Sequence, residues 1–396
     1  MKYPLGIQTF SKIIEDNAIY IDKTDIIYEL IQQGSVYFLS RPRRFGKSLL
    51  ISTIEALFAG RAELFKGLAI TKTDFEFNPY PVIKIEFAKD EFVTGDNLRS
   101  YINHAINQIA EAHSIDIDAE SPNQRFEQLV VKLHQQFGRK VVLLIDEYDK
   151  PILNNLNKPV LAEIKQIMNA FYSGVKALDE HLRFVFITGV SKFAKVSVFS
   201  GMNSLTDISM DLRYATLCGI TEQELNDNFA PAIDELAKIE NTERSDLMAK
   251  IKHWYNGYQF HHKGLGVYNP YSLLSLFNRQ EFKNYWFTTA TPTFLLDLLQ
   301  QKQYNLKDLT DFEVVDEMFD ACEPEDMAVQ SVFLQTGYLT IKEYNEPLYK
   351  VGFPNYEVKK SFFTSVTTRY SHLDKGLGGA FATKLTSPFS SGKRHP

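Results

Sequence analysis

The sequence is poor in cysteine, with Cys218 and Cys322 as the only two among 396 residues. They lie far apart and fit no metal-ligand spacing, so we expect both to be reduced and structural, as is typical of cytoplasmic proteins. The sequence also lacks an apolar leader at its N-terminus and any run near the ~20 apolar residues that span a membrane. Basic charge is not in excess either. The formal net charge is -6, which argues against general electrostatic coating of nucleic acid.

What is present fits a globular protein. The chain is 44% hydrophobic and 23% charged, and it is long enough for two domains or more. Its most informative stretch is Ser40–Ser48, which reads SRPRRFGKS and lies between an apolar run and a segment with helical spacing. A strand, an anion-binding loop and a helix N-terminus in this order are typical of phosphate binding.

The end of this loop, Gly46-Lys47-Ser48, matches the P-loop pattern, in which the lysine reaches the β- and γ-phosphates and the serine hydroxyl binds Mg²⁺. The first glycine of the pattern is missing, and Arg41 stands in its place. Arginine does not share the freedom of glycine at positive φ, so we expect the loop to begin with a different turn, shaped by Pro42. Taken alone, the GKS ending could also be ordinary helix-start chemistry.

A second motif follows about a hundred residues later. Val141–Ile145 is a fully apolar run that predicts a strand buried on both faces, and Asp146 and Glu147 follow at its C-terminal end. Ligands bind at this edge of open parallel sheets. Asp146 is therefore the expected metal-binding carboxylate and Glu147 the expected residue that polarises the attacking water. A solvated loop would explain this pair alone, but the two motifs in this order and context favour phosphate chemistry.

Strands predicted at Val36–Leu39, Pro81–Phe87, Val141–Ile145 and Phe184–Gly189 alternate with predicted helices up to about residue 215. This alternation predicts an α/β fold with a parallel sheet flanked by helices. Beyond that point the pattern is mainly helical and aromatic-rich, with a short strand expected within Leu334–Ile341. We expect most of the 20 Tyr and 30 Phe to pack in the core, because no runs of lysine or arginine are interleaved with them. The predicted units are a P-loop domain at 1–215, a mainly helical domain at 216–370 and a disordered tail at 371–396.

Phosphoryl transfer requires positioning, a metal ion, an oriented water and positive charge. We expect Lys47 and Glu147 to be catalytic, and Ser48 and Asp146 to bind the metal. Thr188, Ser191 and Lys192 follow a further predicted strand, where a sensor of the γ-phosphate belongs, although Thr188 and Ser191 could equally cap a turn. The candidates for an arginine finger are Arg41, Arg43, Arg44 and Arg213, although a solvated surface role is the commoner one for any single arginine. The residues expected to bind nucleotide are Arg43, Arg44, Phe45, Gly46, Lys47, Ser48 and Ser191.

With these residues in view, the chain resembles the predicted AAA-ATPase-like family. The resemblance rests on FLSRPRRFGKS, which contains the loop, and on LLIDEYDKP, which contains the carboxylate pair. Further matching segments are Tyr20–Thr24, Ile187–Phe193, Leu217–Thr221, Tyr285–Phe287 and Leu334–Leu339. Arg41 is part of the form that the loop takes in this family. The resemblance implies a P-loop ATPase fold, ATP and Mg²⁺ as cofactors, the glutamate next to the aspartate as the catalytic residue, and ring or dimer assembly.

Members of that family usually continue into a nuclease-like domain of the PD-(D/E)xK superfamily, which is expected to be absent here. The last residues, from Thr386, resemble no part of the family. The sequence thus predicts an ATP-binding, Mg²⁺-dependent ATP-hydrolysing regulatory module. Two alternatives remain open at this point: a nucleotide-gated interaction scaffold with little turnover, and a protein that binds nucleic acid through the arginine-rich loop and the aromatic second half. Nucleic acid is also a candidate partner of the full-length relatives.

Overall fold

The computed structural model describes residues 2–192, 198–199, 202, 204–286, 293–304, 312–319 and 328–371. Cys322, Phe193, Phe287 and the predicted tail beyond residue 371 lie outside these ranges. In the described part of the chain, five strands form one parallel sheet in the order β2-β3-β4-β1-β5. Their bounds are β1 Val36–Ser40, β2 Val82–Glu86, β3 Val141–Asp146, β4 Leu182–Gly189 and β5 Thr206–Asp207. The predicted α/β fold with a parallel sheet is confirmed.

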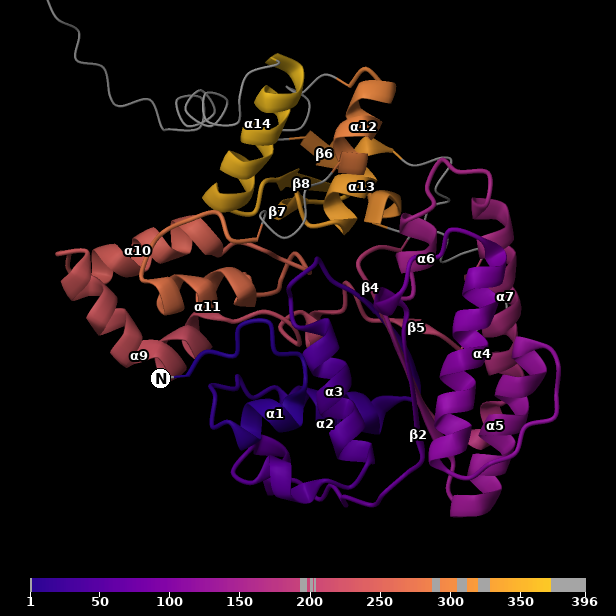
Figure 1. The fold of residues 1–396 in the computed structure, drawn as a ribbon. Coiled ribbons are helices and arrows are strands. Elements are labelled where there is room, and N and C mark those ends of the chain that lie inside the picture. The colour runs from indigo at the N-terminus through magenta and orange to yellow at the C-terminus, as the bar shows by residue number, and fades with distance from the viewer. Residues whose placement is uncertain are drawn as a thin grey trace, which may run out of the picture.

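The strands are apolar on both sides because helices cover both faces of the sheet (Figure 1). Along β3, Leu143 and Ile145 face one core cluster and Val142 and Leu144 face the other, as the two-residue period of a strand requires. The helices of one face are α4 Gly95–Ala112, α5 Pro122–Phe137 and α7 Leu161–Ala177, and those of the other are α1 Phe10–Glu15, α2 Thr24–Gln33 and α3 Lys47–Phe58.

Strand β4 lies between β1 and β3, so the two motif-bearing strands are separated by one strand. Ser40 at the end of β1 pairs with Gly189, and Ile145 near the end of β3 pairs with Ile187. All three strands are parallel, and their C-terminal ends therefore share one edge. This register brings the loop after β1 and the carboxylates after β3 to the same side of the molecule.

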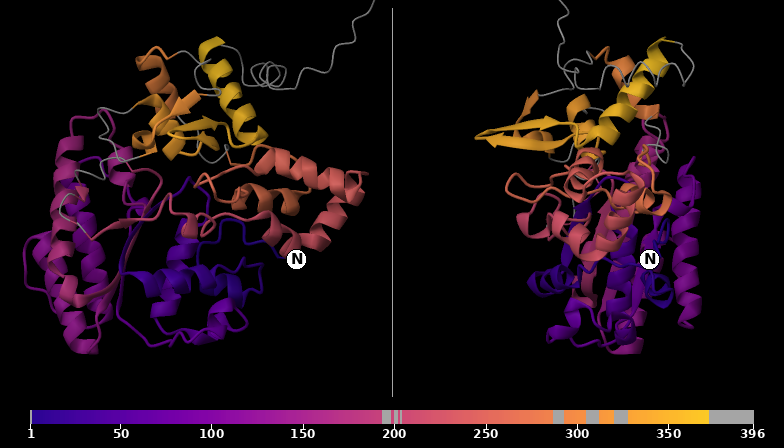
Figure 2. Two further views of the ribbon diagram at one scale, coloured as in Figure 1. Left: turned by 180° about the vertical axis from the view of Figure 1, so that it is seen from behind. Right: turned by 90° about the vertical axis from the view of Figure 1, so that its left-hand side faces the viewer.

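The second half of the chain is mainly helical (Figure 1). Its helices are α9 Glu222–Ile239, α10 Arg244–Tyr255, α11 Pro270–Arg279, α12 Thr293–Gln301, α13 Val329–Gln335 and α14 Tyr356–Ser371. An antiparallel sheet of β6 Phe312–Val314, β8 Leu348–Gly352 and β7 Thr340–Asn345 projects from this region (Figure 2). The strand expected within Leu334–Ile341 begins only at Thr340, because the earlier residues complete α13 and a turn at Gly337 with φ +86°.

The aromatic residues of the second half pack inward, as expected. Tyr255, Tyr258, Tyr268, Tyr285 and Tyr338 are all buried. One core cluster contains Phe45 beside the P-loop together with Trp286 and Phe362 from the second half. The two halves are thus packed on each other, and the division at 215/216 stays a prediction.

The remaining helices are short. They are α6 Lys150–Leu153 and the 3₁₀ helices η1 Ala62–Phe65, η2 Ala69–Lys72, η3 Phe87–Lys89, η4 Asp179–His181, η5 Leu212–Tyr214 and η8 Asp316–Phe319. Among the described residues, none of the helices combines the length and the apolar character needed to cross a membrane.

Candidate functional site

The loop between β1 and α3 has the backbone of an anion-binding turn. Arg44 and Gly46 both adopt positive φ, at +66° and +91°, and α3 begins immediately afterwards at Lys47. In the described part of the chain, the N–H groups of Arg43, Arg44, Phe45 and Gly46 have no hydrogen-bond acceptor. Backbone donors of this kind, at a helix N-terminus, form a concave site for anions.

Lys47 lies across this loop. Its Nζ donates to the carbonyl oxygens of Arg41 at 3.0 Å and Pro42 at 3.2 Å, and the residue is 5% exposed. These carbonyls hold the ammonium inside the loop, and no carboxylate of the described residues forms an ion pair with it. A phosphate oxygen placed there would gain a charge-assisted hydrogen bond.

A pocket of about 310 Å³ opens beside the loop and joins the two motifs. Lys47 and Ser48, at the start of α3, line it together with Glu147, which directly follows β3. The two motifs meet here although they are far apart in sequence. Arg43, Arg44 and Gly46 line it as well. The other lining residues are Pro4, Leu5, Gly6, Ile7, Gln8, Leu49, Lys150, Pro270, Tyr271 and Leu274.

The two carboxylates differ in their surroundings. Asp146 is 2% exposed, and its Oδ1 accepts hydrogen bonds from the Thr188 hydroxyl and from the Glu147 backbone N–H at 3.0 Å. Glu147 adopts positive φ, +52°, which turns its side chain out of the strand direction toward the pocket. Burial raises the pKa of Glu147, with Asp146 and Asp149 adding to the increase and Lys47 opposing it. A carboxylate with a raised pKa is a stronger base.

Asp149 organises the end of β4. Its backbone is the N-cap of α6, but its side chain makes no capping bond. Its Oδ2 instead accepts hydrogen bonds from the Ser191 N–H at 2.8 Å and hydroxyl at 2.7 Å. Ser191 is buried and does not line the pocket, so its contact with nucleotide stays a prediction.

Thr188 and Lys192 also make bonds within the protein. Thr188 orients Asp146, as described above, and the Lys192 ammonium lies 3.1 Å from Oδ2 of Asp207 on β5. Of the three residues expected to sense the γ-phosphate, Thr188 is therefore the one in direct contact with a proposed metal ligand.

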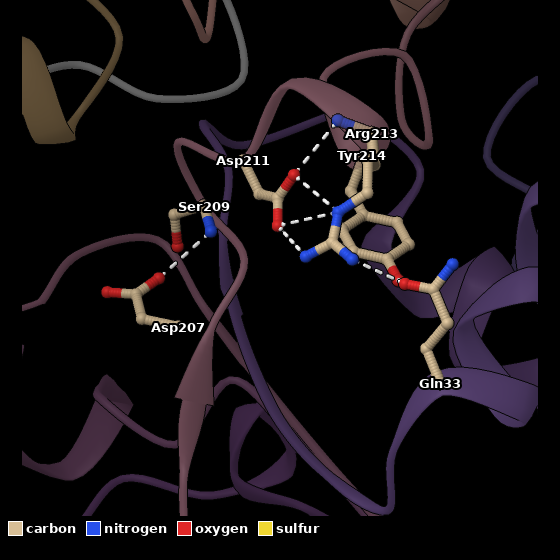
Figure 3. Close-up of polar contacts among 6 residues, drawn as sticks. All are labelled: Gln33, Asp207, Ser209, Asp211, Arg213 and Tyr214. Carbon is tan, nitrogen blue, oxygen red and sulfur yellow. Dashed lines mark hydrogen bonds and ion pairs between the residues drawn. The ribbon is translucent and has the colours of Figure 1, made fainter.

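Two of the four candidate finger arginines point elsewhere. Arg41 is 1% exposed, donates to the carbonyl oxygens of Ser209 at 2.7 Å and Tyr214 at 3.1 Å, and lies over the Phe260 ring at 3.9 Å. Figure 3 shows Arg213 held by Asp211 and by the side chain of Gln33. Arg43 and Arg44 remain at the pocket, where the Arg44 guanidinium lies 4.9 Å from the centre of the Tyr271 ring.

Sequence reasoning missed the parts of the pocket that come from distant segments. Residues 4–8 and Pro270–Tyr271 line it, but neither segment carries a phosphate-binding pattern. Phe45 was expected to bind nucleotide, and its side chain instead packs against Tyr258 and Phe260 with ring centroids 4.7 and 5.5 Å away. Phe45 does not line the pocket beside the loop, so its contact with nucleotide stays a prediction.

Comparison with known proteins identifies the family. The family described as "Predicted AAA-ATPase" matches residues 4–199. A protein of Azotobacter chroococcum mcd 1, named "Uncharacterized protein in vnfD 5'region", is 42% identical over 375 residues, which cover 93% of this chain and 70% of that protein. The chain belongs to the predicted AAA-ATPase family.

Membership of the predicted AAA-ATPase family supports an ATPase module and the binding of ATP. The matched region contains both motifs, the sheet through β4 and the residues of the pocket up to Lys150. The likeness to the Azotobacter protein extends through most of this predicted AAA-ATPase and includes much of its second half.

Proposed function

We propose that this predicted AAA-ATPase binds ATP and hydrolyses it with Mg²⁺. The observation that carries the proposal is the convergence of Lys47, Ser48 and Glu147 on one pocket beside backbone N–H groups without acceptors. The Lys47 ammonium and the loop donors would hold the β- and γ-phosphates. Glu147 would accept a proton from the attacking water as its oxygen bonds to the γ-phosphorus and the bond to ADP breaks, which yields ADP and phosphate.

The donor set around Asp146 fits Mg²⁺. Both recorded hydrogen bonds to Asp146 go to Oδ1, so Oδ2 has no donor among the described residues. Ser48 lines the pocket beside the loop. Asp146 does not line it, but it directly precedes Glu147, which does. No group of three or more His, Cys, Asp or Glu side chains in the described ranges could hold a metal ion. Mg²⁺ in phosphoryl-transfer sites needs no such cage, since one or two protein oxygens, water and phosphates complete its ligands.

An apolar pocket of about 100 Å³ adjoins the phosphate-binding one and suits the nucleotide base. The two pockets share Pro4, Gly46, Leu49, Pro270 and Leu274. Ile19, Ile21 and Leu217–Ile220 supply further walls of the apolar pocket. Apolar lining with few polar groups is typical of sites that bury the flat rings of a ligand.

Calorimetric titration with ATP, with and without Mg²⁺, tests the proposal on wild type and three variants. Lys47→Ala should lose binding at least tenfold, because it removes the buried cation at the phosphates. Glu147→Gln should retain binding and lose turnover by at least a hundredfold. The control Lys238→Ala, at an exposed site in α9, should match wild type. Absence of Mg²⁺-dependent ATP binding by folded wild type, or unchanged turnover in Lys47→Ala, would refute the proposal.

The same titration distinguishes ATP hydrolysis from the alternative of a scaffold that binds ATP with little turnover. Its supporting observation is that Arg41 and Arg213 are engaged away from the pocket, which leaves Arg43 and Arg44 as the finger candidates of the chain itself. ATP binding without measurable hydrolysis would favour the scaffold. Robust hydrolysis by a monomer would exclude it.

The structure does not favour the nucleic-acid alternative. Aromatic residues of the second half such as Tyr255, Tyr258 and Tyr268 are buried, and Arg43 and Arg44 of the arginine-rich loop line the pocket proposed for nucleotide. Undetectable binding of DNA and RNA would remove it. A cytoplasmic location, a regulatory role and a homo-oligomeric state stay part of the proposal. Sedimentation with and without ATP checks the last of these.

A further inference from the structure

Trp286, which follows α11 in the chain, forms a hydrogen bond to the backbone of the P-loop. Its indole N–H donates to the carbonyl oxygen of Arg43 at 3.0 Å, and the residue is 2% exposed. Trp286 does not line the nucleotide pocket. It packs against Tyr338, with ring centroids 5.1 Å apart. The indole thus connects the rear of the loop to the core of the second half.

This hydrogen bond sets the direction of the next backbone donor. The peptide between Arg43 and Arg44 is trans, and in a planar trans peptide the C=O and N–H groups point in opposite directions. With the Arg43 oxygen turned toward Trp286, the Arg44 N–H is turned away from Trp286. Arg44 lines the pocket, and its N–H has no acceptor among the described residues. The geometry directs this donor to the phosphate-binding side of the loop.

Trp286 is itself fixed in place. Its backbone N–H donates to Oε1 of Glu357 at 2.7 Å, and Glu357, in the first turn of α14, is fully buried. The backbone and the side chain of Trp286 are therefore both bonded, to α14 and to the loop. A residue held at both ends loses little further freedom when the loop binds an anion.

We propose that Trp286 is a positioning residue of the nucleotide site, whose indole fixes the Arg43–Arg44 peptide so that the Arg44 N–H is ready to bind phosphate. The proposal rests on the proposed function, since the donor matters only if phosphates occupy the pocket. Arg44 is a non-glycine residue at positive φ, a conformation that costs energy and persists only where neighbouring bonds maintain it. The Trp286 indole provides such a bond.

Trp286→Phe tests this positioning role. Phenylalanine keeps a six-membered aromatic ring and lacks the five-membered ring of indole, which carries the N–H donor. The matched control is Trp254→Phe, since Trp254 is the other of the two tryptophans and packs against Phe282 and Tyr356. In calorimetry with Mg²⁺, ATP should bind about fivefold to tenfold more weakly to Trp286→Phe than to wild type, the effect of one lost hydrogen bond. Trp254→Phe should bind like wild type.

Equal ATP affinity of the two variants would overturn the positioning role and leave the proposed function intact. Failure of wild type itself to bind ATP would overturn both, so the two failures are distinguishable. A second measurement applies even if Trp286→Phe does not fold. In the proton–nitrogen NMR spectrum of wild type, saturating ATP should shift the Trp286 indole resonance and leave that of Trp254 in place. An unmoved Trp286 resonance would contradict the proposal.

Discussion

Arg41 occupies the position of the first P-loop glycine and has become part of the core. Its guanidinium donates to the carbonyl oxygens of Ser40, Ser209 and Tyr214 and lies on the Phe260 ring. Burial lowers the pKa of the guanidinium to about 10, so it stays charged at neutral pH. The arginine ties the start of the loop to the segment after β5, which a glycine could not do.

We expect Arg41→Gly to destabilise the protein, although it restores the glycine of the P-loop pattern. The change leaves the Ser209 and Tyr214 carbonyls without their buried donor, and bonds of this type to a charged group are strong. The free energy of unfolding should fall by about 3 to 5 kcal/mol. Unfolding in urea, followed by circular dichroism, measures it.

The matched control is Arg213→Gly. The Arg213 side chain is 55% exposed, and its ion pair with Asp211 is open to solvent (Figure 3). Solvent-exposed ion pairs contribute little to stability. The loss should therefore be much smaller than at Arg41, and equal losses at the two sites would show that the buried bonds of Arg41 are not what stabilises the loop.

At the scale of elements, the turn between α13 and β7 lies directly against the P-loop. A Cβ atom added at Gly337 would lie 2.5 Å from Cβ and Cγ of Pro42, and Gly337 adopts φ +86°. Beside this turn, the Gln335 side chain accepts a hydrogen bond from the Lys192 N–H at 2.7 Å. The turn therefore touches both the loop after β1 and the segment after β4.

Gly337→Ala should consequently disturb the loop as well as the turn. We expect a loss of about 2 to 4 kcal/mol in the free energy of unfolding, from the positive φ and the contact with Pro42 together. ATP affinity should fall as well, because Pro42 moves with the loop. Thermal unfolding with and without ATP measures both effects.

Gly174→Ala is the control for this change. Gly174 lies within α7, and a Cβ there meets nothing within 4 Å. Alanine favours a helix interior over glycine, so stability should rise by about 1 kcal/mol, with no change in ATP affinity. A Gly337→Ala protein as stable as wild type would show that the close approach to Pro42 is not rigid.

At the scale of the whole molecule, Glu357 links α14 to the region behind the P-loop, and burial raises its pKa to about 7. The titratable groups beside it are the phenols of Tyr255, Tyr258 and Tyr285, whose own pKa values are raised, chiefly by burial, so they stay neutral. In the unfolded chain the same carboxyl has its ordinary pKa of 4.5. The folded state therefore holds this proton more tightly.

The stability contributed by this proton is complete below pH 4.5 and is lost as the pH rises to about 7. The loss should total about 3 kcal/mol in the free energy of unfolding. Glu357→Gln carries no ionisable group, so its advantage over wild type should grow between pH 5 and pH 8. Urea unfolding across this range measures the difference.

Glu343→Gln, at an exposed position in β7, is the control for replacing a glutamate by glutamine. Parallel pH profiles for wild type and Glu357→Gln would contradict the raised pKa. Because burial in the folded core raises the pKa of Glu357, this pH dependence exists only in the folded molecule.

Much of the sheet could be predicted from the sequence because its strands are continuous apolar runs bounded by turns. The expected strands at Val36, Pro81, Val141 and Phe184 correspond to β1, β2, β3 and β4. The short β5 was not predicted, since two residues give no periodicity. The antiparallel sheet was anticipated only in part, because α13 and β7 meet within the one apolar segment that suggested it.

The candidate site divides in the same way. Lys47, Ser48, Asp146 and Glu147 could be proposed from the sequence because a lysine and serine after glycine, and two carboxylates after a buried strand, carry their chemistry within a few residues. Tyr271 and Trp286 carry no such local signal. Nothing near Asp149 in sequence shows that Ser191 lies within hydrogen-bond distance of its carboxylate.

By itself the sequence determined the parallel α/β sheet, the loop and the carboxylate pair, because each depends on the periodicity and chemistry of neighbouring residues. Only the tertiary structure decided that Arg41 turns into the core, that Trp286 bonds to Arg43 and that residues 4–8 close the pocket. These contacts join segments separated by up to hundreds of positions. Their partners are selected by packing and by the need to satisfy buried polar groups, which no local pattern records.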